Sequence, residues 1–297
     1  MQANTSLHKI SVIIPVFNEK DAISATFASL EAVLFKAQIE YEIISVNDGS
    51  TDGSDALLDS LNMKNFSVIH HTINRGYGAS LKTGITHAQH PWILITDADG
   101  TYPIESIPSL LGHMQSYDMI VGARSGQNIH DAISRKIGRS IVRGFASYVS
   151  GAKIEDINSG FRLFKKEHAK KFWHLFPDNF SFTTTLSVAS HTEKHGVKYV
   201  PIDYLKRSGK SSINPTKDFI GFISLVTRLA IYFRPLRIFV PLSLFLFILS
   251  WAILIYGYVS SGTIFDATWA ILIMASVQIL LFGLLADVMV KRLYNNN

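Results

Sequence analysis

Residues 92–100 read Trp92-Ile-Leu-Ile-Thr-Asp-Ala-Asp-Gly100, a short apolar run that ends in two carboxylates. Such a run, bounded by turn residues, is typical of a strand buried in a sheet. Side chains alternate along a strand, so continued strand geometry would point Asp97 and Asp99 the same way. Two carboxylates in one cleft repel each other unless a cation lies between them, and oxygen ligands favour Mg²⁺ or Mn²⁺. A plain turn is the alternative, because Asp and Gly are common turn residues.

Apolar and β-branched runs recur on both sides of this stretch and alternate with segments of helical spacing. They predict strands at 10–15, 41–46, 67–71, 92–96, 118–121 and 197–205, and helices at 22–36, 79–88, 106–114 and 132–150. Alternating strands and helices predict a parallel α/β sheet with right-handed crossovers. On such a sheet, binding and chemistry belong at the carboxyl ends of the strands.

Polar residues follow several of these predicted strands. They are Asn18 and Glu19, Asp48, Asp97 and Asp99, and Arg124. Acidic residues that close successive strands are less expected from ordinary loop composition alone, and they indicate a site at that edge of the sheet. The fingerprint of dinucleotide-binding proteins is missing, since the glycines at 76 and 78 lack a third glycine in place. A nicotinamide-dependent enzyme is therefore disfavoured.

The composition indicates a membrane surface and not a nucleic acid as the partner. Charged residues make up only 17% of the 297 residues, and the net charge of +5 comes without an arginine-rich run or a zinc signature. Many of the basic residues flank apolar segments near the C-terminus, as in proteins that lie at membrane surfaces. The chain contains no cysteine, which excludes disulfides and thiolate chemistry.

Two long apolar runs predict a transmembrane hairpin. Residues 238–258 carry no charge, and residues 268–290 carry only Asp287, near one end. Each run is long enough to span a bilayer. Basic residues flank the pair, and by the positive-inside rule they place both flanks in the cytosol and the short link outside. The alternative is a pair of buried helices in a soluble domain.

These features divide the chain into three expected parts. The first is a cytosolic domain at 1–212, the second an amphipathic helical region at 213–237 that lies in the interface plane, and the third is the hairpin with a short cytosolic tail at 238–297. The polar N-terminus lacks the apolar core of a signal peptide, so we expect the large domain and both termini on the cytosolic side of the cell (inner) membrane. Two spans form a thin bundle, and the sequence leaves a homo-oligomer open.

Six motifs occur in the order seen in one enzyme family. They are Ser11-Val-Ile-Ile-Pro-Val-Phe-Asn-Glu19, Val46-Asn-Asp-Gly-Ser-Thr-Asp-Gly53, Asn74-Arg-Gly-Tyr-Gly78, Asp97-Ala-Asp-Gly-Thr101, Gly122-Ala-Arg124 and Ser159-Gly-Phe-Arg-Leu-Phe164. Together they resemble family 2 glycosyltransferases with the GT-A fold. Within that family they resemble the polyprenyl-phosphate glycosyltransferases, the group that contains dolichyl-phosphate mannose synthase and the bacterial two-span enzymes. The resemblance implies a Rossmann-like, mostly parallel sheet, followed here by an interfacial helix and a two-helix transmembrane hairpin.

The same resemblance implies where substrates bind. The nucleotide-sugar residues would be Pro15, Phe17, Glu19, Asp48, Asp97 and Ala98, with Arg207 and Lys210 on a basic loop that closes over the diphosphate. Asp97 and Asp99 would hold Mg²⁺ or Mn²⁺, and Arg124 would contact phosphate. Arg135 and Arg139 would bind the phosphate of the acceptor.

The residue types agree independently with this chemistry. Breaking a sugar–diphosphate bond leaves negative charge on the leaving group, which a divalent cation together with Arg or Lys stabilises. A lipid phosphate has a second pKa of about 6 and is largely ionised at neutral pH, so as an acceptor it needs no general base. Asp156 occupies the region where relatives that act on alcohols keep their base. We expect it to orient the site or the acceptor, and a role in a turn is the alternative.

The leading hypothesis is therefore an enzyme that transfers one hexose, with inversion, from a nucleotide sugar to undecaprenyl or dolichyl phosphate. UDP-glucose or a related UDP-sugar is the favoured donor because of the two-span topology, and GDP-mannose is the alternative. A processive polysaccharide synthase is a rival, but its Gln-X-X-Arg-Trp motif is absent. The non-enzymatic rival is a membrane scaffold with a degenerate transferase domain.

Overall fold

The computed structural model describes the chain at residues 9–125, 133–178, 181–205, 215–262 and 266–295. The chain forms two compact units, Met1–Phe222 and Ile223–Asn297. The division between them falls inside one helix, α8 (Pro215–Phe233). The sequence-based boundaries at 212 and 237 stay predictions.

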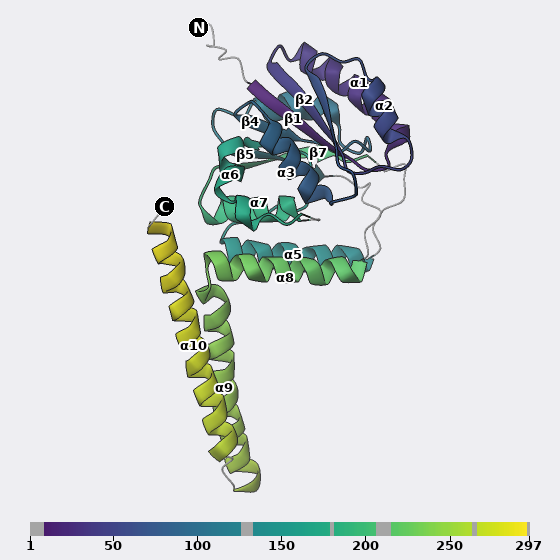
Figure 1. Ribbon diagram of the computed structural model, residues 1–297. Coiled ribbons are helices and arrows are strands. Elements are labelled where there is room, and N and C mark those ends of the chain that lie inside the picture. The colour runs from purple at the N-terminus through teal and green to yellow at the C-terminus, as the bar shows by residue number, and fades with distance from the viewer. Residues whose placement is uncertain (1–8, 126–132, 179–180, 206–214, 263–265, 296–297) are drawn as a thin grey trace. The chain divides into compact units, whose positions relative to one another are not determined.

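The first unit is built on one seven-stranded sheet (Figure 1). Its strands are β1 (Lys9–Val16), β2 (Glu40–Asn47), β3 (Phe66–His70), β4 (Trp92–Ile95), β5 (Met119–Ser125), β6 (Arg162–Lys165) and β7 (Val197–Asp203), in the order β3-β2-β1-β4-β6-β5-β7. All neighbouring pairs are parallel except those of β6, which runs antiparallel to both β4 and β5. The expected mostly parallel α/β sheet is confirmed.

Helices cover both faces of the sheet. Their bounds are α1 (Lys20–Lys36), α2 (Ser54–Ser60), α3 (Tyr77–His87), α4 (Ile107–Leu111), α5 (Ile133–Ser150), α6 (Lys166–Lys171) and α7 (Phe182–Thr192). Alternation along β1 decides the faces, because Val12 and Ile14 share a core cluster with Phe27 of α1, whereas Ile13 points to Gly84 of α3. Figure 1 shows α3 crossing the front of the strands. With both faces buried, the central strands read as continuous apolar runs.

The second unit contains the end of α8 and a hairpin of α9 (Leu236–Ser261) and α10 (Asp266–Asn295). The two long helices are held together where Phe239 packs on Gly283, where the Ser243 hydroxyl donates to the Ser276 carbonyl oxygen at 2.8 Å, and where Trp251 meets Trp269 edge to face at 5.8 Å.

The outer surface of this hairpin is apolar. The most apolar segments of α9 and α10 have mean hydropathies of 2.6 and 2.3, and only 11% of each segment is buried. Large side chains such as Phe245, Val259 and Leu285 are exposed. An apolar surface of this extent marks a partner, and the helices are long and apolar enough for that partner to be the hydrocarbon core of a bilayer.

One close approach fixes α3 on the sheet and supplies a test of the packing. A Cβ atom added at Gly84 would lie 2.4 Å from Cγ2 of Ile13, which is buried on β1. We predict that Gly84→Ala lowers the free energy of unfolding by about 1–3 kcal/mol, because an overpacked core must shift backbone or rotamers. Thermal unfolding in detergent measures the change.

Gly144→Ala is the matched control, because no atom lies within 4 Å of a Cβ at that helical position. Alanine in the interior of a helix is favoured over glycine, so this variant should be at least as stable as the parent. Equal stability of the two variants would contradict the packing described for α3.

Candidate active site

The two carboxylates that follow β4 lie on a tight turn. The strand ends at Ile95, and Asp99 Oδ1 accepts hydrogen bonds from the backbone N–H and the hydroxyl of Thr101 at 3.1 and 2.6 Å. Gly100 has φ +71°, a left-handed conformation that favours glycine. The strand ends before both residues, so strand alternation, the condition of the expected alignment of Asp97 with Asp99, does not apply to them. The two carboxylates therefore lie on a turn and, at the same time, at the carboxyl end of β4, where the candidate site is expected.

Asp97 lies against a buried wall formed by Tyr77 and Gly160. The Tyr77 hydroxyl donates to Asp97 Oδ1 at 3.1 Å. A Cβ atom at residue 160 would be 2.9 Å from that hydroxyl and 3.1 Å from the carboxylate. Burial, and next the charge of Asp97, raise the pKa of Tyr77, so the phenol stays protonated and available as a donor. Only glycine allows the segment that precedes β6 to pass so close beneath Asp97.

Arg124 and Asp156 form a bidentate ion pair. Arg124 Nε and Nη2 donate to the two carboxylate oxygens at 2.7 and 2.8 Å, and the Arg124 backbone N–H adds a third bond at 3.1 Å. Burial alone would raise the pKa of Asp156, but the guanidinium outweighs burial and holds the pKa below its usual value. Arg124 lies within β5, which extends beyond the end predicted at Val121. Asp156 is thus a weak base with a fixed orientation.

An aromatic cluster joins this ion pair to the carboxylate turn. Tyr102 stacks on Phe161 at 5.5 Å and meets Tyr204 edge to face at 5.3 Å, while Arg124 Cζ lies 5.4 Å from the centre of the Tyr204 ring. The Leu205 N–H donates to the Thr101 carbonyl oxygen at 2.9 Å. Burial, with a smaller contribution from the charge of Asp99, raises the pKa of Tyr204. The end of β7 is therefore bonded to the turn that carries Asp99.

The loops after β1 and β2 interlock at the same edge of the sheet. Asn18 donates its backbone N–H to Ser50 Oγ at 3.0 Å, and its side-chain oxygen accepts from the Thr51 N–H at 2.8 Å. Phe17 is 43% exposed, so its ring presents a face to solvent beside partly buried Pro15 and Glu19. An aromatic ring is therefore accessible to solvent directly after β1.

Asp48 is buried, and its carboxylate forms hydrogen bonds with other groups of the protein. Its Oδ1 accepts from the Arg75 N–H at 2.9 Å and lies 2.7 Å from His71 Nδ1, while its Oδ2 accepts from the Gly76 N–H at 2.8 Å. These bonds shape the loop that begins α3 and so place Tyr77 over Asp97. Its predicted position beside a nucleotide base stays a prediction.

The remaining predicted residues are placed only in part. Ala98 is buried, and its carbonyl oxygen accepts from Thr26 Oγ1 at 3.1 Å. Arg207 and Lys210 lie outside the described residues. The backbone of Arg135 and Arg139 lies on α5, and their side chains are outside what the structure describes.

Sequence reasoning did not single out three aromatic residues of this site. Tyr77 and Tyr102 lie inside or directly beside quoted motifs, which is the signal that could have found them. Tyr204 lies near the end of a predicted strand, and only its contact with Arg124 reveals it.

The comparisons with known proteins agree with this geometry. The family described as glycosyl transferase family 2 matches residues 11–173, more than half of the chain. The chain belongs to glycosyl transferase family 2. A second family, described as the GtrB C-terminal hairpin, matches residues 234–291. The resemblance inferred from the six motifs is confirmed, and the chain is a glycosyltransferase.

Curated relatives in this family act on lipid carriers by name. The bactoprenol glucosyl transferase of Shigella phage SfV is 28% identical over 241 residues, which is 80% of this chain and 76% of the relative. The undecaprenyl-phosphate 4-deoxy-4-formamido-L-arabinose transferase of Aeromonas hydrophila is 27% identical over 207 residues, covering 65% and 63% of the two chains.

Solved structures show the same fold. Glucosyl-3-phosphoglycerate synthase of Mycobacterium tuberculosis, in complex with Mn²⁺, UDP and glucosyl-3-phosphoglycerate, has a TM-score of 0.57 at 14% identity and covers 76% of this chain and 81% of its own. Residues 1–349 of S. aureus TarS in complex with UDP give a TM-score of 0.54 at 17% identity, with 74% and 65% covered. The GT-A fold of this glycosyltransferase is thereby established.

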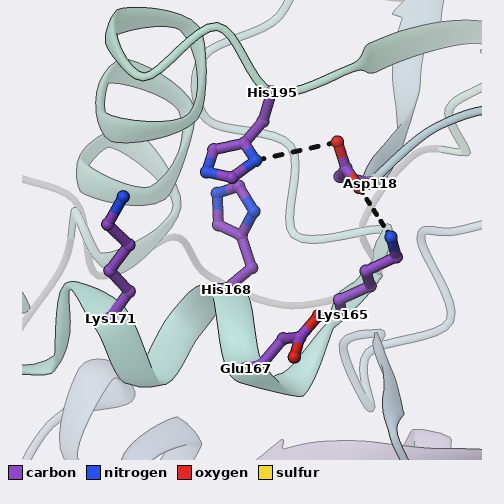
Figure 2. A pocket seen from close by; sticks show the side chains of 6 residues that line it. All are labelled: Asp118, Lys165, Glu167, His168, Lys171 and His195. Carbon is purple, nitrogen blue, oxygen red and sulfur yellow. Dashed lines mark hydrogen bonds and ion pairs between the residues drawn. The ribbon is translucent and has the colours of Figure 1, made fainter.

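The opposite edge of the sheet holds a separate polar cavity (Figure 2). Its volume is about 250 Å³, and it is lined by Asp118, Lys165, Glu167, His168, Lys171 and His195. Asp118 directly precedes β5, and Lys165 ends the antiparallel β6, so both lie away from the carboxyl ends that carry Asp97 and Arg124. An ion pair of 2.7 Å joins Asp118 to Lys165.

Two histidine rings lie next to each other in this cavity, as Figure 2 shows for His168 and His195. Their ring centres are 3.8 Å apart, and the ring planes are tilted by 57°. Ser190 Oγ donates to the Leu186 carbonyl oxygen at 2.6 Å and lies within hydrogen-bond distance of His168 Nε2, at 2.9 Å. Burial, and next the charge that His195 would carry, lower the pKa of His168 to about 3.

The low pKa of His168 makes a prediction for stability against pH. The folded-state pKa of about 3 lies below the ordinary value of 6.5, so the unfolded chain binds the proton more tightly. The contribution of His168 to the free energy of unfolding is fully present above about pH 6.5 and decreases as the pH falls toward 3. At pH 5 this contribution is lower by roughly 2 kcal/mol. Urea unfolding between pH 7 and pH 5 measures the slope.

His168→Gln should flatten this slope, because glutamine does not titrate. The exposed His87→Gln change is the control for losing a histidine elsewhere in the domain. An unchanged slope in the His168→Gln variant would contradict the assignment.

Proposed function

We propose that this protein transfers a single hexose from a nucleotide sugar to a polyprenyl phosphate at the cytosolic face of a membrane. The observation that carries the proposal is that one chain combines this glycosyltransferase site with an exposed apolar hairpin. Relatives of this chain are named for bactoprenol and undecaprenyl phosphate. In this reading α9 and α10 span the inner membrane, and the catalytic domain and both termini face the cytosol.

The paired state of Asp156 supports a phosphate acceptor. An alcohol acceptor requires a base to remove its proton, whereas a phosphate monoester with a second pKa of about 6 is largely ionised at neutral pH. Asp156 is held by Arg124 through two side-chain bonds and has a lowered pKa, so it is poorly suited to accept a proton. Direct attack by an ionised phosphate on the anomeric carbon inverts the configuration there.

We assign the donor to a site that contains the more exposed Pro15, Phe17, Glu19 and Asp97 and the buried Asp48 and Ala98. The exposed face of Phe17 can stack on the base, and the carboxylate of Glu19 can accept from the ribose. We favour UDP-glucose or a related UDP-sugar because a relative is named as a bactoprenol glucosyl transferase and two solved neighbours of the same fold contain UDP. GDP-mannose is the alternative donor.

Asp97 and Asp99 fit a divalent cation. Among the residues that the structure describes, no three His, Cys, Asp or Glu side chains gather into a complete metal site. Two carboxylates nevertheless suit Mg²⁺ or Mn²⁺, which keep several waters and take further oxygens from substrate phosphates. When bound, the cation would neutralise charge on the diphosphate leaving group. A neighbour of the same fold contains Mn²⁺ together with UDP.

Arginines and a lysine complete the proposed site. Arg124, fixed by Asp156, keeps guanidinium N–H groups beside the carboxylate turn, where phosphate oxygens would lie. We assign Arg207 and Lys210 to the diphosphate and Arg135 and Arg139 to the acceptor phosphate. The proposal includes a homo-oligomer, because association of several copies in the membrane would enlarge the thin bundle that two helices form.

The transfer reaction itself is the direct test. Purified protein in detergent is incubated with Mn²⁺ or Mg²⁺, undecaprenyl phosphate and a panel of radiolabelled nucleotide sugars, and label in the organic phase is counted. We expect one donor, a UDP-sugar, to label the lipid only when the cation is present. Asp99→Asn should lower kcat by about 100-fold or more, the order of loss seen when a group that stabilises transition-state charge is removed.

The exposed Asp59→Asn change is the matched control, because it removes one acidic charge away from the turn. Lipid labelling that persists at full rate in Asp99→Asn would refute the site. Nucleotide binding without lipid labelling from any donor would favour an alcohol acceptor. Absence of both nucleotide binding and lipid labelling would favour the membrane scaffold with a degenerate transferase domain.

A further inference from the structure

The motif Ser159-Gly-Phe-Arg-Leu-Phe164 contains an arginine for which the proposed mechanism has no use. Arg162 is completely buried and is the largest such side chain in the described part of the chain. It opens β6, where its backbone pairs with Ile95 of β4 and Val121 of β5. Those partners precede Asp97 and Arg124 by two and three residues, so Arg162 lies directly beneath the site.

The guanidinium of Arg162 holds two segments at once. Nε and Nη2 donate to the Ser159 carbonyl oxygen at 2.9 and 2.5 Å. Nη1 donates to the Thr183 carbonyl oxygen at 2.9 Å and to Ser187 Oγ at 3.1 Å. The planar fork of arginine thus joins the segment 156–160 to the beginning of α7.

Every hydrogen bond described for this guanidinium goes to a neutral acceptor. An arginine is protonated at all physiological pH values, so a full positive charge lies in the core, and none of the described residues bonds a carboxylate to it. Such an arrangement costs stability compared with an apolar residue of similar volume. A costly group at this position calls for a role beyond filling the core.

The segment that Arg162 holds carries the groups of the site. Asp156 begins it, in the ion pair with Arg124, and Asn158 accepts from Thr184 Oγ1 of α7 at 2.9 Å. Gly160 ends it against Asp97, and the Gly160 N–H donates to the Tyr102 hydroxyl at 2.7 Å. A shift of Ser159 would therefore move Asp156 and Gly160 together.

We propose that Arg162 is a positioning residue that fixes Asp156, and through it Arg124, relative to Asp97 by bonding segment 156–160 to the first turns of α7. The inference rests on the proposed function for its catalytic consequence. Its structural content, that one buried fork orders both segments, stands independently of the substrate.

Hydrogen exchange tests the structural content without any substrate. Arg162→Lys keeps the charge but cannot reach the carbonyl oxygens of Ser159 and Thr183 with one fork. We expect amides of 156–160 and 182–187 to exchange about tenfold faster or more, with β1 and β4 unchanged. Ser187→Ala, which removes one neutral partner, should loosen the same segments less and provides the readout if Arg162→Lys does not fold. Unchanged exchange in both segments would overturn the proposal.

A double-mutant cycle with Asp156→Asn tests the catalytic consequence. In Arg162→Lys we expect kcat to fall about 10–100-fold, as for a small misplacement of reacting groups, with little change in KM for the donor. If Arg162 acts through Asp156, kcat of the double variant should be no lower than kcat of the slower single variant. If the two single losses in kcat multiply in the double variant, Arg162 does not act through Asp156.

Arg162→Met and Lys171→Met form a matched pair, since each replaces one cation by an unbranched apolar chain. Lys171 lies at the opposite edge beside the histidine cavity, and its variant should keep wild-type kcat. If the wild-type protein transfers no sugar at all, the proposed function fails, and the exchange result alone decides the positioning role.

Discussion

The bidentate bond between Arg124 and Asp156 is the interaction on which the geometry of the site depends. It joins the end of β5 to the segment that enters β6, and these two strands meet antiparallel inside an otherwise parallel sheet. The pair holds a guanidinium beside the carboxylate turn while it keeps Asp156 ionised. Tyr204 packs on the Arg124 guanidinium and meets Tyr102, which stacks on Phe161. The two paired side chains are mostly buried, which strengthens the charge interaction between them.

The sequence predicted the features that depend on local pattern. Apolar and β-branched runs predicted six of the strands, and the signal is clearest in β1 and β4, where most side chains are buried. The carboxyl edge could be located because acidic residues follow successive strands there. The long uncharged runs predicted α9 and α10, although the structure extends both helices beyond the predicted ends.

The features that the sequence did not predict depend on contacts between distant residues. Nothing in the local sequence of β6 shows that it runs antiparallel between β4 and β5. The turn at Asp99 replaces strand geometry because Thr101 supplies two donors. Arg162 reads as an ordinary basic residue until its burial against Ser159 and Thr183 is seen.

The antiparallel course of β6 also bears on how such enzymes diversify. β5 ends and β6 begins at the same edge of the sheet, so the connection containing α5 leaves and rejoins the scaffold beside the site. Insertions or replacements in this connection can change what lies opposite the donor without altering any strand register. Evolution can therefore vary this connection as a module, while the loops after β1, β2 and β4, to which we assign the donor, keep their places on the sheet.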